Sequence, residues 1–104
     1  MTDTLPKNFS WHDINGKSYI TFLRNQNNPK KCGSCWAISI ASALSDRIKI
    51  WKNASWPEIV LSPQQLLSCS TTGNACQGVS QFQAYKDLVN DVVLVDESCS
   101  QYVA

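Results

Sequence analysis

The pattern of apolar positions is clearest in the middle of the chain. From residue 35 onward, apolar side chains recur at spacings of four, four, four and three: Trp36, Ile40, Leu44, Ile48 and Trp51. Residues at these spacings lie on one stripe of an α-helix. Cations gather towards the end of the stripe, where they complement the helix dipole. The pattern therefore predicts a long helix that begins at Cys35.

Two shorter helices are predicted downstream. Ser62 is a natural N-cap, Pro63 fits the first helical position, and a glutamine stands three residues after the cap. This helix should end near residue 69, and a loop rich in Ser, Thr, Gly and Asn follows. Helical spacing of apolar side chains returns over residues 80–89. Short apolar runs at 19–23 and 92–95 are candidates for extended segments, so the predicted fold class is mainly α.

Composition narrows the function classes. The chain has 104 residues, 43% of them hydrophobic and 16% charged, which is typical of one globular domain. Its net charge of +1 comes without a cluster of Lys and Arg, so we expect no nucleic-acid partner. No apolar run is as long as a membrane span. We also expect no cofactor and no bound metal.

Five cysteines are many for this length. Four could form two disulfides and leave one free thiol, which suits an oxidising compartment, whereas reduced cytosolic thiols are the alternative. The first residues are polar and contain no signal peptide, so we expect upstream sequence to be missing. If the protein is secreted, Asn8 and Asn53 are candidate N-glycosylation sites, because each begins an Asn-x-Ser sequon.

Cys35 is the candidate nucleophile. A cysteine in the first turn of a helix meets unpaired N–H groups and positive potential, and both favour the thiolate. The small residues Gly33 and Ser34 leave the preceding backbone open to a substrate. Acyl transfer also needs hydrogen-bond donors for an oxyanion. The Cys35 N–H and the side-chain amide of Gln26 are the candidates.

Several segments together resemble the papain-like cysteine peptidases. Gln26 with the stretch Cys-Gly-Ser-Cys-Trp-Ala at residues 32–37 resembles their active-site signature. Residues 5–11 resemble the mature N-terminus, and residues 61–69 resemble the second helix. Residues 76–78, Cys-Gln-Gly, resemble a substrate-binding segment. The resemblance implies substrate contacts at the following positions: Gly33, Ser34, Trp36, Gly78 and Val79.

The resemblance also implies a fold and a set of partners. Residues 1–104 would be the helical left domain, a partial domain whose β-rich C-terminal half is absent. Two disulfides are implied, Cys32 with Cys76 and Cys69 with Cys99, in a lysosomal or secreted protein. The substrate would be a peptide or protein. The general base of the family is a histidine oriented by an asparagine, and the single histidine here, His12, lies in the N-terminal segment. We therefore expect this chain alone to be inactive.

Within the family, the chain most resembles the cathepsin X/Z branch. The gap of nine residues between Gln26 and Cys35, with a proline inside it, matches that branch, as does the stretch 96–104. Members of the branch are carboxypeptidases whose inserted loop carries a histidine for the substrate carboxylate. Asn27 stands at the matching position, and Lys30 or Lys31 offers positive charge instead. Val79 replaces a glycine of the family.

Three alternatives remain at this stage. Cys32 and Cys35 have the spacing of a thioredoxin-like redox pair, although the flanking residues differ. The same two residues have zinc-ligand spacing, but the other cysteines form no second close pair. The third alternative is a non-catalytic pseudo-peptidase or binding fragment.

Overall fold

The computed structural model describes residues 5–69, 76–90 and 94–104. Within these residues the helices are α1 Cys35–Trp51, α2 Pro63–Cys69, α3 Gln81–Asn90 and the short 3₁₀ helix η2 Glu97–Cys99. Strand-like pairing in the described part is limited to two isolated β-bridges, Ile14 with Lys17 and Leu61 with Asp96. The fold is mainly α, which confirms the predicted class. The predicted extended segment at 19–23 forms no strand, and residues 92–93 lie outside the described residues.

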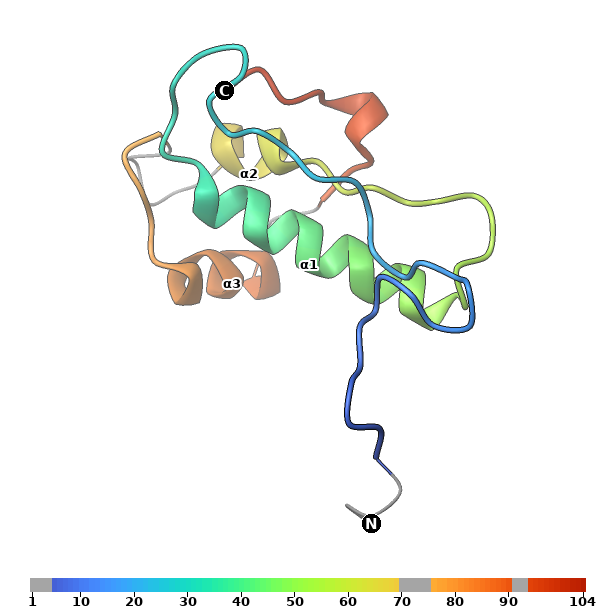
Figure 1. The fold of residues 1–104 in the computed structure, drawn as a ribbon. Coiled ribbons are helices and arrows are strands. Elements are labelled where there is room, and N and C mark those ends of the chain that lie inside the picture. The colour runs from blue at the N-terminus through green and yellow to red at the C-terminus, as the bar shows by residue number, and fades with distance from the viewer. Residues whose placement is uncertain (1–4, 70–75, 91–93) are drawn as a thin grey trace.

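The central element is α1, which lies between α2 and α3 and packs against both (Figure 1). It begins at Cys35, as predicted. Its first turns supply most of the core, because Trp36, Ala37 and Ile40 are buried there. Leu66 and Leu67 of α2 and Ala84 of α3 complete the cluster. The hydrophobic core therefore lies beneath the N-terminal half of α1.

The C-terminal half of α1 is held by polar contacts. Asp46 accepts hydrogen bonds from the N–H and the hydroxyl of Thr21, at 2.7 and 2.8 Å. Lys49 donates to the carbonyl oxygen of Ile20 at 2.9 Å and pairs with Glu58 at 2.7 Å. Trp51 is 84% exposed, so the last position of the predicted apolar stripe lies in the helix but is not buried. The helical periodicity continues beyond the point where the helix has an apolar partner.

The two shorter helices start close to where the sequence predicts. Ser62 caps α2, since its hydroxyl accepts a hydrogen bond from the N–H of Gln65 at 3.2 Å. In α3 the small residue Ala84 faces the core, whereas Phe82 and Val89 are 74% and 85% exposed. The spacing of apolar residues thus predicts the helix correctly but not the face that it buries.

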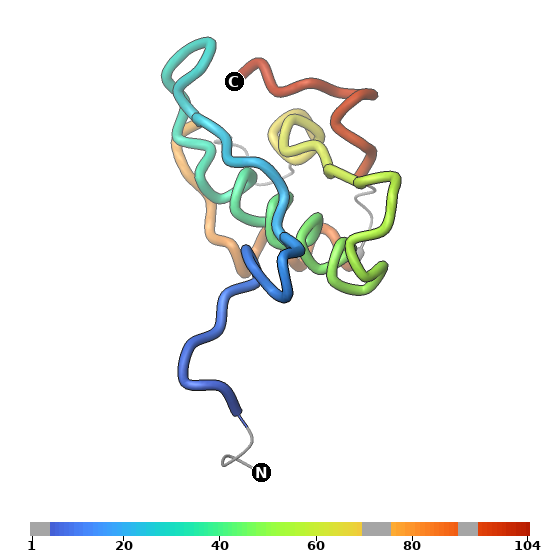
Figure 2. The backbone as a smooth tube through the Cα atoms, turned by 45° about the vertical axis from the view of Figure 1, so that its right-hand side comes forward, coloured from blue at the N-terminus to red at the C-terminus, as the bar shows by residue number. Residues whose placement is uncertain are grey.

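The two ends of the described chain run in different directions. The N-terminal residues leave the body of the molecule near the C-terminal end of α1 (Figure 2). The last residues instead return beside the loop that leads into α1, in both views. Residues near position 102 are therefore placed to contact the loop that carries Cys35.

Candidate active site

The loop that enters α1 is locked to a distant segment. Cys32 forms a disulfide with Cys76, and their Cα atoms are 4.6 Å apart. The N–H of Gly33 donates to the carbonyl oxygen of Cys76 at 2.6 Å. A Cβ atom on Gly33 would lie 2.6 Å from that same oxygen, so the approach requires glycine. The disulfide and this close contact fix the backbone immediately before Cys35.

Cys35 is an exposed free thiol on the first residue of α1. It lines a hollow of about 340 Å³ together with Gln26. The other residues of this hollow are Arg24, Asn25, Ile38 and Ser39. Within the described residues, no hydrogen bond occupies the Cys35 N–H. The structure therefore brings the predicted nucleophile and the predicted oxyanion donor to one concave surface.

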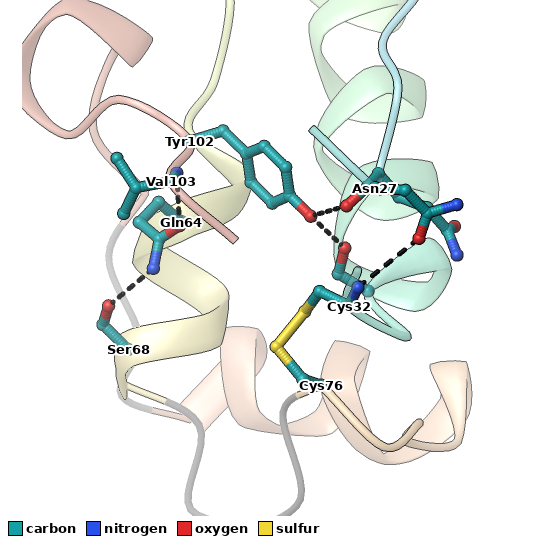
Figure 3. The surroundings of a disulfide bond; sticks show 9 residues. Asn27, Cys32, Gln64, Ser68, Cys76, Tyr102 and Val103 are labelled. Carbon is teal, nitrogen blue, oxygen red and sulfur yellow. Dashed lines mark hydrogen bonds between the residues drawn. A yellow bond between two sulfur atoms is a disulfide. The ribbon is translucent and has the colours of Figure 1, made fainter. Parts of the chain in front are cut away.

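Ser34 has an unusual position for a serine that precedes a helix. It is the N-cap of α1, but its side chain makes no capping hydrogen bond. Its buried hydroxyl lies 2.6 Å from the hydroxyl of Tyr102 instead. The Tyr102 hydroxyl donates to the carbonyl oxygen of Gln26 (Figure 3). Because a phenol has one proton and a carbonyl only accepts, Ser34 must donate to Tyr102.

The ion pair between Arg24 and Glu97 holds the backbone of Tyr102 in place. Arg24 makes two hydrogen bonds to the Glu97 carboxylate, at 3.0 and 2.8 Å. Glu97 also accepts the Tyr102 N–H at 3.1 Å. Sequence reasoning missed these roles, because the contacts of Tyr102 with Ser34 and Gln26 span 68 and 76 residues and no local motif marks them.

The helix η2, which carries Glu97, is capped by Asp96. The Asp96 carboxylate accepts the Ser98 N–H at 3.0 Å and the Ser98 hydroxyl at 2.8 Å. It also accepts the N–H of Val60 at 3.3 Å. These hydrogen bonds, led by that from the Ser98 N–H, lower the pKa of Asp96 although partial burial opposes them. The hydrogen bonds of the cap therefore favour the ionised form of the Asp96 carboxyl group.

Asn27 braces the loop between Gln26 and Cys32. Its side-chain oxygen accepts the Cys32 N–H at 3.4 Å (Figure 3). Its own N–H donates to the side chain of Asn25 at 2.9 Å. Asn27 is thus hydrogen-bonded to residues of its own loop. Lys30 and Lys31 nearby in sequence are exposed.

The predicted substrate-binding residues differ in what they can offer. Ser34 and Trp36 are buried, at 0% and 2% exposure, and their contacts with a substrate remain predictions. Gly33 and the exposed Gly78 can present backbone, and Gly78 has a φ of 106°, which favours glycine. Val79 is half-buried and packs against the core. Its branched side chain therefore serves packing here.

The predicted second disulfide is not present in the structure. Cys69 and Cys99 are both exposed free thiols. Cys69 is the last residue of α2, whereas η2 is bonded to the backbone just before α2, through the Glu97 N–H and the Val60 carbonyl. Each thiol thus belongs to the end of a different helix, Cys69 to α2 and Cys99 to η2.

His12 lies away from the candidate site. It is exposed, and its neighbour Trp11 lines a hollow with residues of the C-terminal half of α1, beginning at Asp46. Asp46 lies eleven residues after Cys35, which is about 17 Å along a helix. Because the chain has one histidine, no imidazole from these 104 residues reaches Cys35.

The disulfide also decides between the alternatives for the cysteines. Cys32 is bonded to Cys76, so it is available neither for a redox pair with Cys35 nor as a zinc ligand. In the described part of the chain, no cluster of three or more His, Cys, Asp or Glu side chains is arranged to hold a metal ion. None of the described helices is long and apolar enough to cross a membrane.

The comparisons with known proteins identify the family of this chain. The family model described as papain family cysteine protease matches residues 5–104. Over 102 residues, the chain is 38% identical to cathepsin Z of Onchocerca volvulus, covering 98% of the chain and 33% of that protein. It is 38% identical over 82 residues to cathepsin F of Drosophila melanogaster, which covers 79% of the chain and 12% of that protein. The chain belongs to the papain family of cysteine proteases, and it spans about a third or less of the length of these relatives.

Proposed function

We propose that the protein is a cysteine peptidase of the cathepsin X/Z type, with Cys35 as its nucleophile. The observation that carries this proposal is that the exposed Cys35 thiol and Gln26 line the same hollow. In the reaction, the thiolate attacks the peptide carbonyl carbon, and the C–N bond breaks as the amine leaves with a proton. Water then hydrolyses the Cys35 thioester. The Cys35 N–H and the Gln26 amide would stabilise the oxyanion in both steps.

The general base must come from outside these residues. His12 lies near the other end of α1, so a histidine and its orienting asparagine would be supplied by a β-rich half that packs beside the helical one. Residues 1–104 would then be the helical half-domain of the enzyme. It follows that the 104-residue chain alone should show no turnover of peptides, because Cys35 lacks a proton acceptor.

The specificity proposal concerns the end of the substrate. In the cathepsin X/Z branch a histidine helps hold the C-terminal carboxylate. Asn27 stands at the matching position here, and its side-chain oxygen already accepts a hydrogen bond from the Cys32 N–H. Lys30 and Lys31 are exposed on the same loop and carry positive charge. We propose that carboxypeptidase activity, if present in the intact enzyme, uses these lysines to attract the carboxylate.

The compartment is also a proposal. The Cys32–Cys76 disulfide favours the secretory pathway or the lysosome. Asn8 and Asn53, the two sequon asparagines, are exposed and thus accessible to glycosylation in that pathway.

A labelling experiment tests the proposed nucleophile on the chain itself. Cys69 and Cys99 are exposed thiols outside the hollow and serve as internal controls. The rate of alkylation by a peptidyl chloromethyl ketone, divided by the rate with iodoacetamide, is measured at each cysteine by mass spectrometry. This ratio should be about tenfold higher at Cys35, because one oxyanion hydrogen bond contributes roughly that factor.

Two outcomes would contradict the proposal. Equal ratios at the three thiols would favour a non-catalytic protein that keeps the fold without the chemistry. In a parallel assay with a fluorogenic peptide, turnover by the isolated chain that disappears in Cys35→Ser would show that no external histidine is needed.

A further inference from the structure

The contacts of Tyr102 have no place in the proposed function so far. Its hydroxyl joins the Gln26 carbonyl to the Ser34 hydroxyl, and its N–H binds Glu97, which is paired with Arg24. We call these five residues the Tyr102 brace. They come from three segments: the loop before α1, the N-cap of α1, and the stretch formed by η2 and the residues after it.

We propose that Tyr102 is a positioning residue for the oxyanion site, setting the place of Gln26 relative to Cys35. This inference rests on the proposed function. One proposed oxyanion donor, Gln26, is a member of the brace. The other, Cys35, directly follows the brace residue Ser34 in the sequence. A single phenol oxygen hydrogen-bonded to both segments therefore determines how far apart the two donors lie.

The brace is rigid because each contact is shared or buried. Arg24 and Glu97 are mostly buried, with side chains 8% and 20% exposed, and they meet through two parallel hydrogen bonds. Arg24 and Gln26 are two residues apart. Glu97 binds the first and Tyr102 binds the second, so both ends of this short segment are held. The Ser34 hydroxyl binds the Tyr102 hydroxyl and makes no capping hydrogen bond to α1. Phenylalanine at position 102 would keep the ring and lose both side-chain contacts.

The test uses reversible addition of an N-acetyl dipeptide aldehyde, isotopically labelled at the aldehyde carbon. The Cys35 sulfur bonds to that carbon, and the carbonyl oxygen takes the thiol proton to give a hemithioacetal. The parent chain carries Cys69→Ser and Cys99→Ser, which leaves Cys35 as the free thiol. The dissociation constant is measured by NMR, and it reports on the oxyanion site without needing a general base.

We expect Gln26→Ala to weaken the adduct about tenfold, and Tyr102→Phe to weaken it by a similar factor. The double variant should be no weaker than either single variant, because Tyr102 acts through Gln26. Tyr85→Phe on α3 makes the same chemical change at a partly exposed position and should bind like the parent. An unchanged constant in Tyr102→Phe, or additive effects in the double variant, would overturn the positioning role.

Two further results distinguish a failure of the proposed function from a failure of the positioning role. If the parent chain forms no adduct that depends on Cys35, the proposed function is wrong and the positioning role falls with it. If Tyr102→Phe does not fold, as judged by circular dichroism, Ser34→Ala cuts one contact of the brace and keeps Tyr102. That variant should weaken the adduct a few-fold, and binding equal to that of the parent would overturn the inference.

Discussion

The two ends of α1 are stabilised in different ways, although one amphipathic pattern runs through both. At the N-terminal end, Trp36 and Ile40 are buried and a disulfide fixes the entering loop. At the C-terminal end, Trp51 is exposed and the helix is held by side chains such as Asp46 and Lys49 that bind neighbouring backbone. The end that carries Cys35 thus has covalent and apolar support, and the other end has mostly polar support.

The difference between the two ends fits the need of the candidate site for fixed hydrogen-bond donors. Oxyanion donors act efficiently only when they are fixed before the reaction begins. The buried core and the disulfide supply that rigidity around Cys35. The far end of α1 has no such requirement, and hydrogen bonds of the kind found there contribute about 1 kcal/mol each.

The largest expected effect comes from removing the disulfide. Cys32→Ala with Cys76→Ala should lower the free energy of unfolding by about 4 kcal/mol, because the bond closes a loop of 44 residues. Urea denaturation of the double variant beside the parent measures this change. A loss below about 1 kcal/mol would mean that the site end of α1 does not depend on covalent support.

A matched pair of substitutions on α1 compares its two ends directly. Ile40→Ala should lower the free energy of unfolding by about 3 kcal/mol, since it opens a cavity in the core. Trp51→Ala removes a larger side chain, but it should change stability by less than about 0.5 kcal/mol because that side chain is exposed. Thermal or urea unfolding of both variants tests the contrast, and similar losses at the two ends would break it.

The smallest effect concerns acid. The folded-state pKa of Asp96 is lowered, so its contribution to stability is present above the unfolded pKa and is lost as the pH falls through the folded one. Asp96→Asn should cost less than about 1 kcal/mol at pH 7. It should also flatten the decline in unfolding free energy below about pH 4, measured by urea titrations at several pH values.

Ser98→Ala serves as the control for the acid experiment, because it removes one of the hydrogen bonds that stabilise the ionised Asp96. The acid-dependent decline should be intermediate in this variant. If Asp96→Asn retains the full decline of the parent, the cap of η2 is not the acid-sensitive element near the site.

The sequence was sufficient to predict the helices and the start of the longest of them. The start of α1 at Cys35 and the cap of α2 at Ser62 follow from local signals, because helix termini depend on residues within one turn. The resemblance to a family predicted that Cys35 and Gln26 lie close together. In the structure both residues line the same hollow.

Other features could not be predicted, because they depend on which distant segments meet. Trp51 and Phe82 fit their helical stripes, but periodicity does not say whether another element covers a face. Ser34 has the side chain of an N-cap and binds Tyr102 instead. No local sequence signal marks Cys69 and Cys99 as the cysteines that stay free in this structure.

The contact between Ser34 and Tyr102 spans 68 residues, and this has a consequence for biosynthesis. Gln26 and Cys35 leave the ribosome several seconds before Tyr102 at ordinary rates of translation. During that interval the growing chain carries the thiol without the Tyr102 brace. The loop that carries Gln26 therefore acquires its hydrogen bond to Tyr102 only after most of the 104 residues have been synthesised.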